Sequence, residues 1–388
     1  MSVPGPLTGL VIVDLTRVLA GPFCTMLLAD LGARVIKVEA PGSGDDSRHF
    51  GPFVNGQSAY FAALNRGKES IVLDLKQAQD RATFDGLLQR ADVLVENYRA
   101  GTMDKLGYGW PVLQQRFPRL VYAATSGFGH TGPYAGRAAY DVIVQAMGGV
   151  MSITGQPDGP PTRVGTSIGD LTAGLFTGIG VLSALRHRDQ TGAGMMVDVS
   201  MLDCQIAILE NAITRYLVTG VTPEPLGTRH ATIAPFEAYA AADRSIVIAA
   251  ANEALFEKLA VAIGRPNLPR DPRFDSNDRR ARNVFALKAE IESALAARPA
   301  IEWVEALNLA GVPCGPINTV ADAVNDPQIE ARNMLIEIAD PIMGKIRVPG
   351  NPIKMSAFAD PPDRKAAPAL DADRARLLAE LGQADRRS

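Results

Sequence analysis

One carboxylate, Asp170, stands between a polar run and a long run without charge. The polar run, Gly165–Gly169, begins and ends with glycine, and the charge-free run extends over Leu171–Leu185. Small residues recur in the second run. Each glycine costs a helix about 1 kcal/mol, so glycines are tolerated mainly where backbones must approach closely. We therefore expect a buried helix against which another element packs, with Asp170 at its N-terminus.

Asp170 has two interpretations, one structural and one chemical. As an N-cap, its side chain would accept an orphan backbone N–H, a role for which aspartate is favoured. As a nucleophile, it would act from the mouth of a pocket. An aspartate with a pKa near 3.9 is ionised at pH 7, so it would need no histidine partner, unlike serine or threonine. The four histidines of the chain do not cluster. Spacing alone favours the cap.

The elements that would position Asp170 begin with a β-α-β unit. We expect a strand buried on both faces at Leu10–Leu15, a helix at Phe23–Leu31 that Gly32 ends, and a strand at Val35–Glu39. This unit is typical of half a nucleotide-binding fold. Its first turn reads TRVLAGP and lacks the G-x-G-x-x-G glycines, which excludes an NAD site.

Further strands alternate with helices along the first half of the chain. We expect strands at Ser70–Leu75, Val93–Glu96, Leu120–Ser126 and Gly194–Ser200, and a long helix at Met201–Leu217. Strands that alternate with helices predict an α/β fold with a mainly parallel sheet. The helices expected between the strands are Gln77–Arg90, Gly101–Gly107, Trp110–Phe117 and one that starts near Asp141.

The length of 388 residues favours two domains, and the character of the chain changes near Thr219. A hairpin at Phe236–Ala249, followed by helical stretches, predicts a smaller α+β domain. We place the large domain at residues 1–205 and 321–388, a linker helix at 206–224, and the small domain at 225–320.

Composition excludes several classes of function. A net charge of −3 gives no basic surface for nucleic acid or an anionic membrane. The N-terminus has no charged region before an apolar run, and we expect the helix after Asp170 to be shorter than a membrane span of about 20 residues. Cys24, Cys204 and Cys314 are far apart, which predicts reduced thiols without a metal site. We expect a cytoplasmic protein with no nucleic-acid or membrane partner.

A set of motifs carries a family resemblance over nearly the whole chain. The stretches are Val13–Pro22, Gly32–Arg48, Asn65–Lys76, Asp92–Gly107, Tyr140–Gly155, Gly165–Gly174 and Gly311–Asn318. Together they resemble the class III CoA-transferases, a family that includes formyl-CoA:oxalate CoA-transferase and 2-methylacyl-CoA racemases. The resemblance implies a Rossmann-like large domain, an interlocked homodimer, and Asp170 as a covalent nucleophile.

The resemblance also implies where coenzyme A would lie. The matching positions are Val18, Leu19, Leu73, Lys76, Asn97, Tyr98, Lys105 and Leu106. A lysine of the family falls on Ala138 here, and Arg137 beside it is the expected substitute. Leu19 and Ala40 stand where formyl-CoA transferases carry glutamine and arginine, which argues against oxalate or formate as substrates. No cofactor is expected to stay bound, because CoA enters as part of the substrate.

A carboxylate nucleophile can move CoA in four steps. Asp170 attacks the donor thioester and forms a mixed anhydride, which releases CoA thiolate. The thiolate attacks the aspartyl carbonyl and leaves an aspartyl–CoA thioester. The acceptor carboxylate attacks that thioester, giving a second anhydride, and the thiolate then regenerates Asp170 and releases the new acyl-CoA. Gly169 suits close approach of the substrate and backbone N–H groups that stabilise oxyanions.

The chain as a whole resembles the branch of the family that handles dicarboxylates, with succinyl-CoA as the expected donor. A distal carboxylate favours a cationic partner. The candidates are Arg48, Arg137, Arg163 and Arg229, with His230 beside the last, and Arg163 is preferred because it lies shortly before Asp170.

Two alternative functions remain open from the sequence. A 2-methylacyl-CoA racemase would need two acid–base groups, but Tyr140 occupies the position of the family's histidine, and a phenol with a pKa near 10 is a poor base. Tyr140 is interpreted equally well as a packed aromatic residue or a substrate contact. A non-catalytic CoA-binding protein is the second alternative, against which the presence of Asp170 argues.

Overall fold

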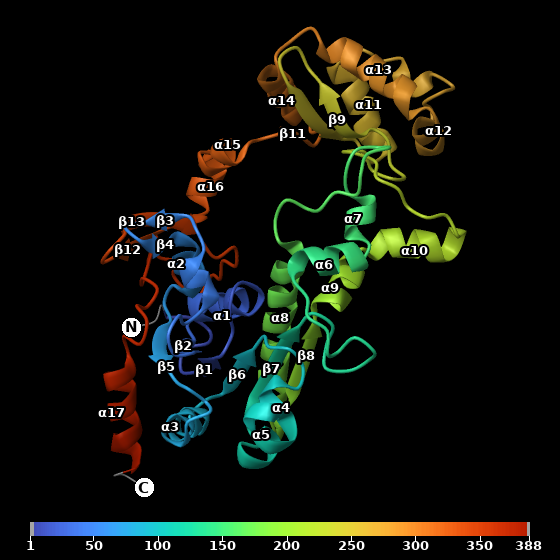
Figure 1. Ribbon diagram of the computed structural model, residues 1–388. Coiled ribbons are helices and arrows are strands. Elements are labelled where there is room, and N and C mark those ends of the chain that lie inside the picture. The colour runs from blue at the N-terminus through green and yellow to red at the C-terminus, as the bar shows by residue number, and fades with distance from the viewer. Residues whose placement is uncertain (1–3, 386–388) are drawn as a thin grey trace. The chain divides into compact units, whose positions relative to one another are not determined.

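The computed structural model describes residues 4–385, and their contacts divide the chain into two units (Figure 1). Among these residues, the first unit comprises 4–151, 163–221 and 327–385, and the second comprises 152–162 and 222–326. The small domain predicted from the sequence, at 225–320, includes no part of 152–162.

The first unit is built on a six-stranded sheet in which every neighbouring pair is parallel. The strand order is β5 (Glu69–Val72), β2 (Arg34–Glu39), β1 (Val11–Asp14), β6 (Val93–Glu96), β7 (Val121–Ser126) and β8 (Met196–Ser200). The predicted α/β class and mainly parallel sheet are confirmed. The chain order reverses between β1 and β6, as in doubly wound folds, and ligands in such folds bind outside the carboxyl ends of the strands at that point.

Side chains that alternate along the strands pack against helices on both faces of the sheet. On one face, Ile12 and Val121 pack with α1 (Ala20–Asp30) and α8 (Ile168–Thr191). On the other face, Val13 and Tyr122 pack with a second group of helices. That group is α3 (Ala78–Leu88), α4 (Thr102–Leu106), α5 (Trp110–Arg116) and α17 (Arg374–Asp385).

The glycines of α8 mark close contacts, as expected for a helix against which other elements pack. A Cβ at Gly174 would lie 2.6 Å from the carbonyl oxygen of Ala20 in α1, and one at Gly180 would lie 2.5 Å from Val197 Cγ1 in β8. Figure 1 shows α8 running along β7 and β8. Glycine is therefore required where α8 meets its neighbours.

The predicted length of α8 is wrong. The helix continues to Thr191 and has 24 residues, and Arg188 in its last turn is buried and forms an ion pair with Asp92 at 2.7 Å. Among the described residues it is the single helix long and apolar enough to cross a membrane by length and composition, with a mean hydropathy of 1.5. Here one of its faces packs on α1 and the sheet.

The remaining elements of the first unit are short or lie at its edges. The predicted helix Met201–Leu217 is divided into α9 (Met201–Ile208) and α10 (Glu210–Thr219), although Leu209 between them keeps helical angles. The others are η1 (Asp46–His49), β3 (Phe53–Val54), β4 (Gln57–Ser58), α2 (Ala59–Asn65), α6 (Asp141–Met147), α16 (Pro327–Ala331), β12 (Leu335–Asp340), β13 (Gly344–Pro349) and β14 (Asp363–Arg364), and α7 (Val150–Ile153) spans the boundary between the units.

The second unit has its own sheet and core. The strands β9 (Phe236–Ala240), β10 (Ser245–Ala249) and β11 (Cys314–Pro316) form an antiparallel sheet in the order β11-β10-β9. Phe256 and Leu287 are fully buried in its core. The helical elements are α11 (Glu253–Ala262), η2 (Leu268–Arg270), α12 (Asn277–Arg282), α13 (Val284–Leu295), α14 (Ala300–Leu309) and α15 (Val320–Val324).

Candidate active site

A cavity of about 390 Å³ lies within the first unit, where the strand order reverses. The loops that follow β1, β6 and β7 line it, together with the beginnings of α6 and α8. Of the residues that the sequence analysis selected, the cavity brings together Val18, Leu19, Asn97, Tyr98, Arg137, Tyr140 and Asp170.

Asp170 is the third residue of α8, and Ser167 stands at the N-cap position. The interpretation of Asp170 as the cap is therefore wrong. The structure gives the Asp170 carboxylate no hydrogen bond or ion pair to another described side chain, and this carboxylate lines the cavity. It is thus held by its place on the helix and is free to meet a ligand.

The backbone beside Asp170 is fixed by a second carboxylate, that of Asp141. Asp141 begins α6, is 7% exposed, and accepts the N–H of Gly169 through Oδ1 at 2.8 Å. Its Oδ2 accepts the side-chain amide of Gln145 at 2.8 Å, and the Gln145 carbonyl accepts the N–H of Val164 at 2.9 Å. These bonds attach the chain entering α8 to α6.

The same geometry corrects the expected role of Gly169. Its N–H donates to Asp141 and is not free to stabilise an oxyanion. A Cβ at this position would lie 2.7 Å from Val144 Cγ2 and 3.0 Å from Asp141 Oδ1. Glycine is needed here for close packing between α8 and α6, which in turn sets the position of Asp170.

The electrostatic setting of Asp170 also differs from the expectation of an ordinary acid. Burial, with a smaller contribution from the negative charge of Asp141, raises the pKa of Asp170 to about 7. The carboxylate is then about half ionised at neutral pH. The surroundings thus destabilise the anion of Asp170 and make this carboxylate more basic than that of an exposed aspartate.

Three arginine residues line the cavity, Arg17, Arg99 and Arg137, and the guanidinium of Arg137 lies 3.8 Å from the ring centre of Tyr134. Arg17 forms an ion pair with Asp46 at 3.3 Å and lies 5.7 Å from the ring centre of Tyr98. Side chains of this type bind carboxylate and phosphate groups bidentately. Sequence reasoning missed Arg17 and Arg99, although each directly adjoins a residue that it selected.

Asn97 ties together the two loops that meet at the switch point. Its Oδ1 accepts the N–H of Arg17 and its Nδ2 donates to the carbonyl of Arg17, each at 2.8 Å. Tyr140, by contrast, is 75% exposed at the N-cap position of α6, so the interpretation of Tyr140 as a packed aromatic residue is wrong. Its ring is available to a ligand in the cavity.

Other selected residues do not line the cavity. Arg48 donates two hydrogen bonds to Glu39, at 2.7 and 2.8 Å, and covers the ring of Phe61 at 3.8 Å. It is therefore committed to the fold, which corrects its assignment to a substrate carboxylate. Leu73 is 3% exposed in the core, so its side chain cannot reach a ligand in the cavity. The remaining residues of the CoA set outside this cavity are Lys76, Lys105 and Leu106.

Arg163 and His230 have local partners instead of a place on this cavity. Arg163 donates to the carbonyl of Val164 at 3.2 Å and lies 3.8 Å from Asp141 Oδ2. His230 belongs to the second unit, and its Nδ1 accepts the N–H groups of Thr232 and Ile233 at 3.2 and 3.1 Å. The ring of His230 thus stabilises a turn.

Comparison with known proteins identifies relatives of the whole chain. Residues 7–374 match CoA-transferase family III. An acetyl-CoA:oxalate CoA-transferase of Acetobacter aceti is 51% identical over 97% of this chain and 96% of its own. A succinyl-CoA:mesaconate CoA-transferase of Haloarcula hispanica is 42% identical over 97% of both chains. A crystal structure of a CAIB/BAIF family protein from Brucella suis, 40% identical, superposes with a TM-score of 0.85 over 97% of this chain and all of the other. The chain therefore belongs to CoA-transferase family III.

Proposed function

We propose that this enzyme moves CoA from an acyl-CoA donor to a dicarboxylic acid through covalent intermediates on Asp170. The observation that carries the proposal is the position of Asp170, whose carboxylate has no described partner and lines the cavity at the switch point of the sheet. A carboxylate in this position can attack a thioester, and its raised pKa leaves a basic, poorly solvated anion.

The substrate class rests on the chemistry of the cavity and on the named relatives. Oxalate and mesaconate, the acids in the names of the two relatives, are both dicarboxylates. Arg17, Arg99 and Arg137 supply positive charge for the second carboxylate and for the phosphates of CoA. We propose succinyl-CoA as the donor. Oxalate belongs among the acceptors tested, because a relative 51% identical is named for it, in spite of Leu19 and Ala40.

The reaction balances without an outside reagent. The first attack exchanges the thioester for an anhydride and a thiolate, and the second transfers CoA to the Asp170 carbonyl and releases the donor acid. The acceptor acid then displaces the thiolate, and the returning thiolate takes the acceptor acyl group and frees Asp170. Water must be kept out, because the anhydrides and the thioester all hydrolyse.

A mass-spectrometric exchange assay tests the function. Succinyl-CoA is incubated with a panel of acids (oxalate, mesaconate, itaconate, glutarate and malate) and the wild type, Asp170→Asn or Asp189→Asn. Asp189 is a matched carboxylate on the same helix and is 59% exposed on its side chain. New acyl-CoA from the wild type and Asp189→Asn, but none from Asp170→Asn, is the expected result. Exchange that survives in Asp170→Asn would overturn the proposal.

The same assay separates the alternatives. Hydroxylamine added during turnover should convert the activated Asp170 into a hydroxamate, which a peptide mass identifies. Loss of stereochemistry in a 2-methylacyl-CoA, without exchange between any pair of acids, would establish a racemase. Tight binding of CoA with neither reaction would establish a non-catalytic binding protein.

We also propose that the enzyme is a homodimer. Along α8, one stripe of apolar side chains at helical spacing is exposed in the first unit: Leu175 (47%), Phe176 (39%), Ile179 (59%) and Leu182 (39%). An apolar stripe of this kind is a common sign of a protein interface. A second copy of the chain is its proposed partner.

A further inference from the structure

The wall of the cavity contains a strained residue, Val18. Its φ is +67°, in the left-handed region, where a β-branched residue is rarely found. Val18 lies in the loop between β1 and α1 and lines the cavity with Leu19. Strain of this kind persists only where surrounding groups impose it, so the structure must hold Val18 in place.

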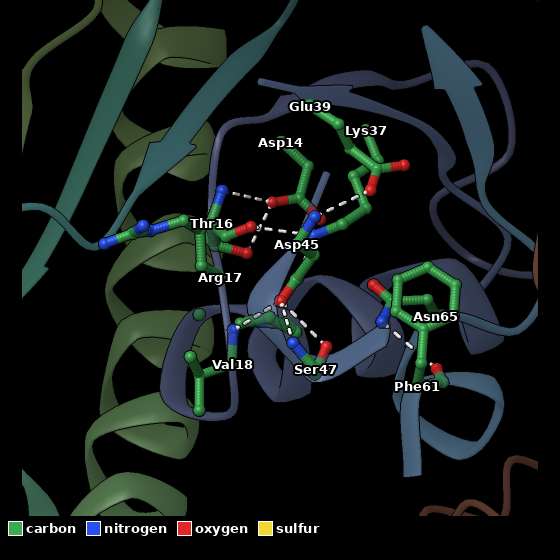
Figure 2. A network of polar contacts seen from close by, with 12 residues as sticks. Asp14, Thr16, Arg17, Val18, Lys37, Glu39, Asp45, Ser47, Phe61 and Asn65 are labelled. Carbon is green, nitrogen blue, oxygen red and sulfur yellow. Dashed lines mark hydrogen bonds and ion pairs between the residues drawn. The ribbon is translucent and has the colours of Figure 1, made fainter. Parts of the chain in front are cut away.

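The group that holds Val18 is the carboxylate of Asp45. Oδ1 of Asp45 accepts the N–H of Val18 at 3.1 Å, and the same oxygen accepts the N–H and hydroxyl of Ser47 at 2.9 and 2.8 Å. Figure 2 shows these bonds converging on one oxygen. Asp45 is 1% exposed, and its own N–H donates to Glu39 at 3.0 Å. The oxygen that accepts the N–H of Val18 is thus fixed by several hydrogen bonds and shielded from solvent.

A buried cation completes the arrangement. Lys37 forms an ion pair with Oδ2 of Asp45 at 2.8 Å, and its Nζ also donates to the carbonyl of Thr16 at 2.7 Å. Lys37 is fully buried. The ion pair therefore binds the backbone of the loop at two points: Lys37 donates to the carbonyl of Thr16, and Asp45 accepts the N–H of Val18. We call Lys37, Asp45 and these two bonds the loop clamp.

The loop has a further anchor below the clamp. Thr16 donates its N–H to Asp14 at 2.8 Å and its hydroxyl to the same oxygen at 2.5 Å. Asp14 is in turn paired with Lys68 at 3.0 Å, and both are fully buried. Buried ion pairs add little net stability compared with apolar packing. Two of them beneath one loop suggest that they serve to fix its conformation.

We propose that Asp45 is a positioning residue, which holds Val18 in its left-handed conformation and so shapes the acyl-CoA-binding wall of the cavity before the substrate arrives. Asp45 acts through the backbone and does not itself line the cavity. The identity of the ligand rests on the proposed function, whereas the clamp itself does not. Without the clamp, Val18 relaxes to a negative φ and the wall moves.

Hydrogen–deuterium exchange tests the clamp without any turnover. In the wild type, the Val18 amide should be protected, because it donates to a buried carboxylate. In Asp45→Ala we expect it to exchange at least about tenfold faster while the Ile12 amide in β1 stays protected. Asp30→Ala is the matched control, since Asp30 is also a buried acid (3% exposed side chain), paired with Arg66 at 2.7 Å, but does not line the cavity. Unchanged Val18 protection in Asp45→Ala would overturn the proposal.

Steady-state kinetics distinguishes a loss of Val18 positioning from a general destabilisation of the protein. In the wild-type background, we expect Asp45→Ala to raise the KM for acyl-CoA about tenfold. In the Val18→Gly background, the same substitution should raise KM less than about threefold, because glycine adopts a positive φ unaided. The kcat should change less than KM in both backgrounds, and Asp30→Ala should leave KM unchanged. An equal effect of Asp45→Ala in the two backgrounds would show mere destabilisation and overturn the proposal.

A second variant covers the case in which Asp45→Ala does not fold, since it leaves Lys37 buried without its partner. Val18→Pro removes the N–H and imposes a negative φ while the ion pair stays intact. It should raise KM, or the Kd for CoA measured by calorimetry, by at least about tenfold; no change would contradict the clamp. If the wild type binds CoA but exchanges none, the proposed function fails while these binding and exchange measurements still decide the inference.

Discussion

Asp141 and Gly169 are joined by a 2.8 Å hydrogen bond, so the residue beside Asp170 is fixed by the carboxylate whose charge contributes to the raised pKa of Asp170. One side chain thus provides both geometry and electrostatics. It lies 28 positions earlier in the chain than Gly169, on a different helix. The contact between α6 and α8 therefore fixes the backbone beside Asp170 and adds to the effect of burial on its pKa.

The first prediction concerns pH. The pKa of Asp170 is raised to about 7, and only the ionised form attacks, so kcat/KM should rise with pH and level off above the pKa. Below it, kcat/KM should fall about tenfold for each pH unit. The measurement is kcat/KM for acyl-CoA at saturating acceptor between about pH 5 and pH 9, a range that brackets the pKa. A flat profile over this range would mean an ordinary aspartate and contradict the raised pKa.

A variant of Asp141 is the matched control for that profile. Asp141→Asn keeps an oxygen to accept the N–H of Gly169, but it removes the negative charge near Asp170. The acidic limb should therefore move to lower pH, although not to the ordinary value, because burial is the larger cause of the shift. A limb that stays in place would assign the whole shift to burial.

The central strands β1, β2, β6 and β7 could be predicted well from the sequence because they are buried on both faces. Val93–Glu96 was predicted with its observed bounds, since a continuous apolar run leaves no other placement. The end of α8 was missed because charged residues after Leu185 suggest solvent, whereas Arg188 is buried and paired with Asp92. A charge whose partner is distant in sequence gives no local signal.

The candidate site likewise contains residues that the sequence predicts and residues that only the folded structure reveals. Asp170 and the loop residues Val18 and Asn97 lie within sequence motifs, so they could be selected from the sequence. Asp45 and Asp141 act on backbone N–H groups 27 and 28 positions away, and only the folded chain brings them there. Similarly, Arg48 looked like a free cation in a polar loop until the structure paired it with the buried Glu39.

The second prediction concerns stability. A raised acid pKa means that the native state binds the proton more tightly than the unfolded chain, so stability falls as pH rises from about 4 to about 7. Asp170→Asn has no carboxyl group at this position to ionise, so its stability should not fall in this way. It should be more stable than the wild type by on the order of 1 to 2 kcal/mol above pH 7, since solvent in the cavity screens part of the effect. Below about pH 4 the difference should vanish.

Urea denaturation at several pH values measures the difference. Asp189→Asn, an exposed carboxylate on the same helix, should show no such pH-dependent gain. A gain for Asp170→Asn that is the same at pH 4 and pH 8 would have to come from packing and would contradict the electrostatic explanation.

The third prediction concerns the dimer. Ile179→Asp places a charge in the exposed apolar stripe of α8, where the wild-type side chain is 59% exposed. A two-fold interface would receive the charge twice, so the dissociation constant should rise at least about a hundredfold. Sedimentation velocity should then show monomers. Ile301→Asp, on α14 and 51% exposed, is the matched control and should stay dimeric. A wild type that sediments as a monomer would remove the proposal.

The fourth prediction concerns the packing behind Asp170. Gly169→Ala adds a methyl group 2.7 Å from Val144 Cγ2 and 3.0 Å from Asp141 Oδ1, so α8 must shift away from α6. We expect a loss of about 1 to 3 kcal/mol of stability from overpacking and at least a tenfold fall in kcat, because Asp170 moves with the helix.

Gly165→Ala is the control, since a Cβ there meets no atom within 4 Å. It should leave stability within about 0.5 kcal/mol of the wild type, as is usual for surface changes. If Gly169→Ala lost stability but kept its kcat, then the contact between α6 and α8 would hold the fold without setting the position of the nucleophile. If both alanines reduced kcat equally, the polar run before α8 would need to move during the reaction, and its flexibility would matter more than its packing.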